Sequence, residues 1–458
     1  MRYKIIVLII FSIVSSQSLF NRFLGGDSFS GSARSTAMGN THLLSSTGSN
    51  NIRFNPAMLS RKNASIDFKV NRFSSFERWS MPVRDSFDEV LTHADYVSNE
   101  FSKFLVSGGA AISLNIPFIG NIGVGLSQYP LTHFTYAYSE EVRGTYRPED
   151  GEYATKDPII GYQNYNVDGT VFANSIGVGA TLNLFGDFKT SVGASLNLTR
   201  PFTLNERVDV VSLYSDVTNL AVYSDVKDSY DIDSDMFISV STIVDLTVSS
   251  MVGLFYESKL QLKTDNSNMP IDSKNGLFQY WGVAEQFTDL NGDEQWNDGE
   301  TFIDDNENGQ WDNEYLPLGL NYLKPEIMGF SWGYKTSNEE SLSINFEVDQ
   351  VSYNDHLNLN DIYNWKFGFE YLTQLGTPVR AGLLYSTSPV NSLPATTMFT
   401  FGSGKKIGEI VIDISGAYQL YTYKYPDFFV VEGDVRPDYY DTIRDSQLNL
   451  FLAISYSF

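Results

Sequence analysis

The last twelve residues alternate strictly between two faces, and this pattern constrains the fold more than any other feature of the chain. From Gln447 to Phe458, every second residue beginning with Leu448 is apolar, and most residues between them are small or polar. Because successive side chains of a strand point to opposite faces, this period of two predicts a β-strand with one apolar face. That face ends in Tyr456 and Phe458, as is typical where a lipid-facing strand reaches the membrane surface.

The same alternation recurs along the chain and predicts fourteen strands. In Trp365–Tyr371, for example, aromatic residues alternate with lysine, glycine and glutamate. A soluble sandwich also alternates, so the period alone does not separate it from a membrane barrel. The predicted strands lie near residues 64–73, 106–116, 121–129, 171–184, 188–199, 235–245, 248–262, 326–336, 341–350, 364–372, 378–387, 396–404, 408–420 and 446–458.

The connections between these strands are sorted by length, which a soluble fold has no reason to do. Six short connections alternate with seven longer ones. The longer ones are residues 74–105, 130–170, 200–234, 263–325, 351–363, 388–395 and 421–445. Short periplasmic turns and long extracellular loops are typical of outer-membrane barrels. We therefore predict an all-β fold, a transmembrane antiparallel β-barrel of about 14 strands, closed because hydrocarbon cannot pair a free backbone group.

The N-terminus has the features of a secretion signal. Arg2 and Lys4 precede an apolar run, Ile5–Val14, which is followed by small and polar residues. This run is too short to span a bilayer as a helix. We predict that residues 1–18 are a signal peptide cleaved near residues 16–18, and a buried N-terminal helix is the alternative.

The composition excludes several classes of function. A formal net charge of −24 repels phosphate, so we expect no nucleic-acid partner. The chain has no cysteine, which excludes disulfides, thiolate zinc sites and a cysteine nucleophile. The histidines lack the paired spacing of metal or catalytic motifs, so we expect no enzyme and no catalytic residue. They are His42, His93, His133 and His356.

Two stretches carry a family resemblance. Residues 30–59 begin and continue with small and polar residues and end near the triplet Asn55-Pro56-Ala57. Residues 365–389 combine a strand of aromatic, glycine, aromatic, glutamate and tyrosine with a turn and a second strand. In order and spacing they resemble the FadL/TodX-type outer-membrane transporters of hydrophobic compounds. The resemblance extends over residues from about 25 to 458.

The resemblance implies an N-terminal hatch that plugs the barrel. Residues 19–62 would form this hatch, with Asn55, Pro56 and Ala57 as its motif, and residues 63–458 would form the barrel. Residues 263–325 would be a long extracellular loop. In the family, ligand passes from a surface groove to a pocket in the lumen, and movement of the hatch opens a lateral gap in the wall.

The resemblance also implies a function and a location. We expect a channel for uptake of long-chain fatty acids or other hydrophobic small molecules by gated diffusion, in the outer membrane of a Gram-negative-type bacterium. Its partners would be outer-membrane lipid and the hydrophobic ligand. The alternative is a secretion-system-associated, PorV-like barrel that handles exported surface proteins. A structural or adhesive surface barrel is a third interpretation.

Charged residues on the polar face of the predicted strands are the candidates for a lumen or gating site. They are Glu347, Asp349, Lys366, Glu370, Arg380 and Asp413. Ordinary hydrated filling of the barrel interior is the simplest interpretation. Arg380 is the strongest candidate, because an interior cation beside Glu370 could hold the hatch and a lone buried charge is costly. Binding of a fatty-acid carboxylate by Arg380 is the alternative.

An acidic loop has the spacing of a twelve-residue calcium site. Oxygen ligands, which Ca²⁺ prefers, stand at positions 1, 3, 5, 7 and 12. They are Asp289, Asn291, Asp293, Gln295 and Glu300, and a second copy follows with Asp304, Asn306, Asn308 and Asp312. The first copy departs from the pattern at Glu294, where a glycine is usual. We predict structural calcium and no organic cofactor; an acidic loop kept soluble by its charge is the alternative.

Overall fold

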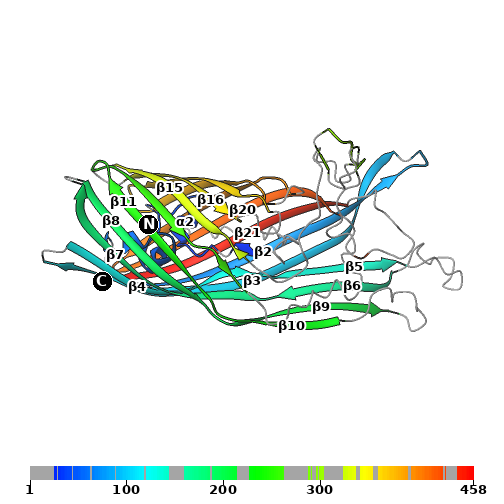
Figure 1. Ribbon diagram of the computed structural model, residues 1–458, viewed down its shortest axis with the longest axis horizontal. Helices are drawn as coiled ribbons and strands as arrows, with labels where there is room; N and C mark the ends of the chain where they lie inside the picture. Colours follow the sequence, from blue (N-terminus) through cyan, green and yellow to red (C-terminus); the bar gives the residue numbers. More distant parts are fainter. Residues whose placement is uncertain are drawn as a thin grey trace, which may run out of the picture.

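The computed structural model describes residues 25–27, 29–43, 45–61, 64–87, 89–117, 120–143, 159–185, 188–213, 226–262, 287–288, 290, 296–297, 299–303, 323–336, 341–353, 359–389, 393–425, 429 and 441–458. Fourteen antiparallel strands form the wall of a barrel (Figure 1). They are β2 (Ser65–Arg84), β3 (Val90–Ile116), β4 (Gly120–His133), β7 (Thr170–Phe185), β8 (Phe188–Thr199), β11 (Met236–Asp245), β12 (Ser250–Glu257), β15 (Glu326–Lys335), β16 (Leu342–Ser352), β17 (Ile362–Leu372), β18 (Pro378–Ser386), β19 (Thr396–Ile407), β20 (Ile410–Tyr425) and β21 (Asp441–Ser457). The barrel is closed because β4 pairs with both β3 and β7.

All fourteen predicted strands are confirmed, but the connection predicted at 74–105 is wrong. Most of it is strand, because β2 and β3 pair from Ser65 opposite Ala111 to Arg84 opposite Val90. The upper part of this hairpin projects beyond the barrel (Figure 1). In this part of the hairpin, successive residues no longer alternate between apolar and polar. The period of two that marks lipid-facing strands is therefore lost there.

Two further connections predicted as loops contain a second sheet. It consists of β5 (Tyr136–Arg143), β6 (Ile159–Asp168), β9 (Phe202–Ser212) and β10 (Val226–Ile232), in the order β10-β9-β6-β5. These strands continue β4, β7, β8 and β11 beyond the barrel (Figure 1). Gly169 and Pro201 interrupt the chain where two of the strands pass from one sheet to the other. Such residues are typical of turns, which is why the sequence predicted loops.

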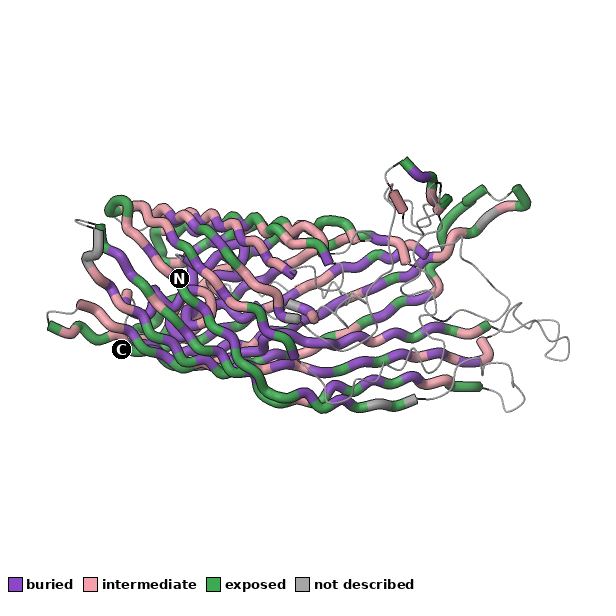
Figure 2. The backbone as a smooth tube through the Cα atoms, in the orientation of Figure 1, coloured by how far each residue is buried: buried purple, intermediate pink, exposed green. Residues whose placement is uncertain are grey.

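The wall has an apolar outer face and a polar inner face. On β17, Trp365, Phe367 and Tyr371 are exposed on the outside, whereas Lys366 and Glu370 between them are buried on the inside. The same alternation of buried and exposed residues runs along most wall strands (Figure 2). An apolar exterior of this kind is what contact with lipid requires.

The hatch, residues 25–61, lies inside the barrel. It contains α2 (Ala33–Ala37), η1 (Gly48–Asn50), α3 (Asn51–Phe54) and η2 (Pro56–Arg61). It packs so closely that a Cβ on Gly382 of β18 would collide with the backbone nitrogen of Gly39, and one on Gly193 of β8 with that of Ala57. Glycine is therefore required in the wall where the hatch backbone touches it. None of the helices among the described residues has the length and apolar character of a membrane span.

Candidate functional site

Glu370, one of the predicted site residues, joins the hatch to the wall. It accepts two hydrogen bonds from Arg34 on α2, at 2.9 and 2.5 Å. It also accepts one of 2.6 Å from Arg380 on β18, and Arg380 donates another of 2.6 Å to Asp413 on β20. All four side chains are largely buried, so each charge depends on its partners. Arg380 is thus linked to the hatch through the carboxylate that it shares with Arg34.

Two other hatch arginines, which the sequence analysis did not single out, pair with the wall. Arg53 on α3 donates two hydrogen bonds to Glu257 on β12, at 2.9 and 2.8 Å, and Lys324 lies 3.0 Å from the same carboxylate. Arg61 on η2 pairs with Asp245 on β11 at 2.5 Å. Arginines are otherwise rare in this stretch of small residues, and each needs a carboxylate once buried. The need of a buried arginine for a carboxylate partner was therefore the feature of the sequence from which these pairs could have been predicted.

Lys366, Glu347 and Asp349, also predicted site residues, form a separate buried cluster. The ammonium group of Lys366 on β17 lies 2.9 Å from Glu347 and 2.6 Å from Asp349, both on β16. Glu347 also accepts a hydrogen bond of 2.9 Å from the backbone N–H of His42 in the hatch. The cluster therefore fixes the hatch between α2 and α3.

The triplet Asn55-Pro56-Ala57 forms the joint between α3 and η2. Asn55 ends α3, and its backbone N–H donates to Asn51 O at 2.8 Å. Pro56 begins η2, and the N–H of Ala57 donates to Ser241 Oγ on β11 at 2.9 Å. The triplet thus turns the chain and ties the joint to the wall.

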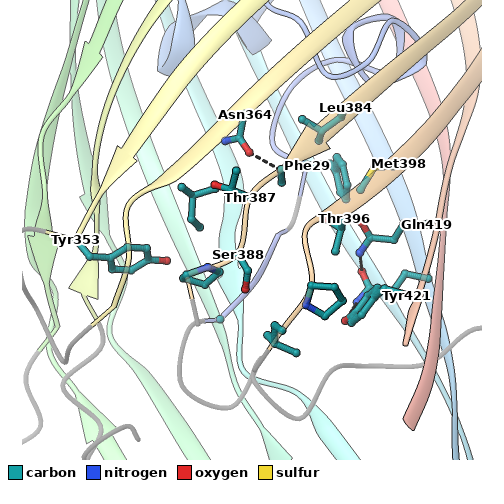
Figure 3. Close-up of a pocket in the computed structure, with 17 residues that line it drawn as sticks. Phe29, Tyr353, Asn364, Leu384, Thr387, Ser388, Thr396, Met398, Gln419 and Tyr421 are labelled. Carbon is teal, nitrogen blue, oxygen red and sulfur yellow. Dashed lines mark hydrogen bonds between the residues drawn. The ribbon is translucent and has the colours of Figure 1, made fainter. Parts of the chain in front are cut away.

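A cavity of about 270 Å³ lies in the barrel on the long-loop side of α2 (Figure 3). Phe29 of the hatch, Leu384 of β18 and Met398 of β19 face it from one side, and Tyr353 and Tyr421 also line it. None of its lining residues is charged. We call it the outer cavity. It offers a surface that is more apolar than polar and carries hydroxyl and amide groups, which suits an uncharged molecule.

A second cavity, of about 260 Å³, adjoins the first, and we call it the inner cavity. The two cavities share five lining residues: Gly25, Ile362, Asn364, Leu384 and Ser386. The inner cavity has charged lining residues, which the outer one lacks. Arg53, Lys324 and Lys366 line it together with His42, Asn40 and Asp349. The described lumen therefore contains two adjacent cavities, one with an uncharged lining and one with charged groups.

One seam of the wall lacks a continuous strand ladder. β3 pairs with β4 only as far as Gly108 opposite Gln128. Beyond this point β4 is irregular at Pro130, and its residues Thr132–His133 pair with β1 (Gly26–Asp27) of the hatch. Proline cannot donate a ladder hydrogen bond and is found at such irregularities. The hatch strand β1 therefore pairs with β4 where β3 and β4 part.

Of the predicted calcium ligands, only Glu300 is among the described residues. Its carboxylate accepts hydrogen bonds from the backbone N–H groups of Leu290 and Asn297, at 2.8 and 2.9 Å. Trp296 also donates its indole N–H to Glu300 O at 3.1 Å. The other predicted ligands lie outside the described residues: Asp289, Asn291, Asp293, Gln295, Asp304, Asn306, Asn308 and Asp312. Within the described part of the chain, no three acidic or histidine side chains gather into a metal site.

Several solved structures share this fold, although no protein-family model and no curated protein sequence matches the chain. A FadL homologue of Pseudomonas aeruginosa is 12% identical, with a TM-score of 0.53, over 95% of this chain and 100% of that chain. The toluene transporter TodX of Pseudomonas putida is 14% identical, with a TM-score of 0.52, over 93% of this chain and 98% of that chain. The chain therefore has the plugged fourteen-stranded barrel fold of the FadL/TodX-type channels, and the predicted fold is confirmed.

Proposed function

We propose that the protein is an outer-membrane channel for the uptake of long-chain fatty acids or other hydrophobic small molecules by gated diffusion. The observation that carries this proposal is the uncharged outer cavity, which lies within a barrel whose exterior is apolar. Moving apolar surface from water into such a cavity is favourable by about 25 cal/mol per Å². The polar inner cavity next to it gives room for the head of an amphipathic ligand.

The seam between β3 and β4 supports a route through the wall. Phe104 and Val106 are exposed on the outer face of β3, just above the point where its pairing with β4 ends. A ligand dissolved in the lipid could leave or enter there once β1 moves. The predicted signal peptide, residues 1–18, lies outside the described residues, and together with the apolar exterior it supports the outer membrane of a Gram-negative-type bacterium.

Uptake by cells tests this proposal directly. A strain without its own hydrophobic-compound channel, expressing this chain, should accumulate radiolabelled oleate or toluene faster than the empty strain. Leu384→Trp, which fills the outer cavity, should abolish the gain, whereas Phe367→Trp on the outer face should not. Equal uptake with and without the protein would refute the proposal. If deletion in the native host instead traps surface proteins in the periplasm, the secretion role is correct.

We also propose that the acidic loop binds structural calcium. The hydrogen bonds from the N–H groups of Leu290 and Asn297 support this, because they hold the carboxylate at position 12 beside residues near the start and the end of the same twelve-residue segment. Calorimetry on the whole protein should detect Ca²⁺ binding that Glu300→Gln weakens. The variant Glu326→Gln, whose carboxylate meets the Tyr256 hydroxyl at 2.9 Å, should bind as the native protein does. Absence of binding in the millimolar range would refute this proposal.

A further inference from the structure

A third cavity, of about 530 Å³, lies at the short-turn end of the barrel, and we call it the turn-side cavity. Six wall strands line it together with α2 and η1 of the hatch: β2, β17, β18, β19, β20 and β21. It shares no lining residue with the outer or the inner cavity. The outer cavity lies on the long-loop side of α2, so the hatch has a cavity on each of its two sides.

The lining of the turn-side cavity carries more positive than negative charge. Four cations and three carboxylates line it: Arg34, Arg380, Lys405, Lys406, Asp67, Glu370 and Asp413. Two of these cations and two of these carboxylates form the network that joins α2 to the wall, which is neutral in itself. The chain as a whole has a net charge of −24, so an excess of cations around one cavity runs against its composition.

Asp67, the remaining carboxylate of the lining, is bonded to uncharged groups. Its Oδ2 accepts hydrogen bonds from the backbone N–H of Ser49 and the hydroxyl of Ser65, at 2.7 and 3.0 Å. Asp67 on β2 and Lys406 on β19 lie in register, with β21 and β20 between them. Three strand spacings of about 4.8 Å place their backbones roughly 14 Å apart along the sheet. Asp67 therefore does not neutralise the lysines.

Lys406 is the cation of the lining whose charge stays open to a ligand. Gly402, four positions earlier on β19, faces the hatch, and the alternation of a strand places Lys406 on the same inner face. Within the described part of the chain, Lys406 has neither a hydrogen bond nor an ion pair. Its side chain is exposed, so a molecule in the cavity can reach the ammonium group. Lys405, by contrast, donates to Leu375 O at 3.2 Å.

Apolar side chains surround this open charge. Val411 stands directly opposite Lys406 in the pairing of β19 with β20. Leu372 and Pro378 line the same cavity from β17 and its turn to β18. Apolar surface of this kind favours an apolar ligand group over water, whereas a small hydrated ion would leave it in contact with water. One uncompensated positive charge beside apolar surface matches a ligand with one negative charge and an apolar chain.

We infer that the turn-side cavity binds an amphipathic monoanion, such as a short-chain carboxylate, with its charged group at Lys406 and its apolar chain against Leu372, Pro378 and Val411. The ammonium group has three donors and no acceptor, so a carboxylate can accept from it directly. This inference goes beyond the proposed function, because uptake of an uncharged compound through the outer cavity needs neither Lys406 nor the turn-side cavity.

A single cysteine can report whether the cavity is occupied, since the chain has none of its own. Ser455→Cys places a thiol in the lining, and Ser457→Cys is a second reporter there. Uncharged methyl methanethiosulfonate should modify either thiol in the purified full-length protein at pH 7.5. The probes share one chain length and differ in charge: hexanoate, hexan-1-ol and hexylamine, which is a cation at this pH.

Hexanoate should protect the thiol best. We expect half-protection at a concentration about fivefold lower than for hexan-1-ol, the change in affinity that an ion pair of about 1 kcal/mol produces. Hexylamine should protect least. Ser98→Cys, at an exposed position that lines none of the three cavities, should react at the same rate with every probe.

Substitutions of Lys406 test the site in the same cysteine background. Lys406→Gln should remove the advantage of hexanoate over hexan-1-ol, and Lys406→Glu should reverse the order so that hexylamine protects best. Both variants should fold as the native protein does, because Lys406 is exposed and makes no ion pair with the described residues. Lys189→Gln, at an exposed lysine that lines none of the three cavities, is the matched control and should keep the native order.

The outcomes separate this inference from the proposed function. Equal protection by the three probes, protection by none of them, or a hexanoate advantage that Lys406→Gln leaves unchanged would refute the carboxylate site. The channel proposal stands in each of these cases if the protein still accelerates uptake of oleate or toluene. Protection by hexanoate in a protein that does not accelerate uptake refutes the channel instead and supports the site.

Discussion

Glu257→Gln is the variant that tests most sharply how the hatch is held. Glu257 accepts two hydrogen bonds from Arg53 and lies 3.0 Å from Lys324, and its side chain is 2% exposed. Glutamine keeps the size of the side chain and removes its charge. Arg53 and Lys324 would then be two buried cations that have lost the carboxylate between them.

The substitution should lower the free energy difference that keeps the hatch seated in the barrel. Removing one partner of a buried ion pair costs about 3–5 kcal/mol. The ladder hydrogen bonds of the wall are unaffected, and Arg53, whose side chain is 11% exposed, gains full hydration when the hatch leaves its place. A free energy of about 1.4 kcal/mol changes an equilibrium constant tenfold. Even the lower value therefore raises the ratio of displaced to seated hatch by roughly a hundredfold.

Conductance and proteolysis report the displacement independently. Single channels of Glu257→Gln in planar bilayers should open far more often than native ones, and trypsin should cut after Arg53. Glu326→Gln, which removes a carboxylate bonded to the Tyr256 hydroxyl, is the matched control and should behave as the native protein. Restoring neutrality with Arg53→Met and Lys324→Met in the same chain should close the channel again. A Glu257→Gln channel as closed and as resistant to trypsin as the control would refute the reasoning.

Two other predictions concern the contacts of the hatch with the wall. Gly382→Val should displace the hatch at Gly39, at a cost on the order of 1–3 kcal/mol, and raise conductance, whereas Ala381→Val on the outer face should not. Unchanged conductance in Gly382→Val would contradict the observed packing. Because the chain has no cysteine, Asp27→Cys with Thr132→Cys, at paired positions of β1 and β4, should form a disulfide that stops uptake until it is reduced. The wall pair Ser127→Cys with Ser175→Cys should leave uptake unchanged, and a cross-linked hatch that still transports would exclude movement of β1.

The wall could be predicted from the sequence because lipid imposes one rule on every strand. Each outer position must be apolar, so strands such as Trp365–Tyr371 can be recognised in the sequence by their alternation of apolar and polar residues. Beyond the membrane this rule ends. β5, β6, β9 and β10 have a polar outer face in water and lie next to turn residues such as Pro201, so nothing in their local sequence separated them from loops.

The site could be predicted only in part, for a different reason. Neighbouring strands joined by a short turn fix the register, so Glu370 and Arg380 could be placed side by side from the sequence. The hatch has no period and few large side chains, and therefore its path cannot be read from its composition. The pairing of Arg34 with Glu370, and both cavities, depend on that path.

The glycines that the hatch touches have a consequence for how the barrel is assembled. Gly193 and Gly382 lie on opposite parts of the sheet, and each leaves a hollow that is the shape of hatch backbone. Glycine weakens a strand by its entropy, so a wall that closed without its plug would have unfilled hollows on its inner face and strands that no packing supports there. The position of the plug is thus specified both by residues 25–61 and by the glycines of the wall that leave room for its backbone. We expect the N-terminal segment to act as the template around which the strands close, so that supplying it later, as a separate peptide, would not recover a barrel formed without it.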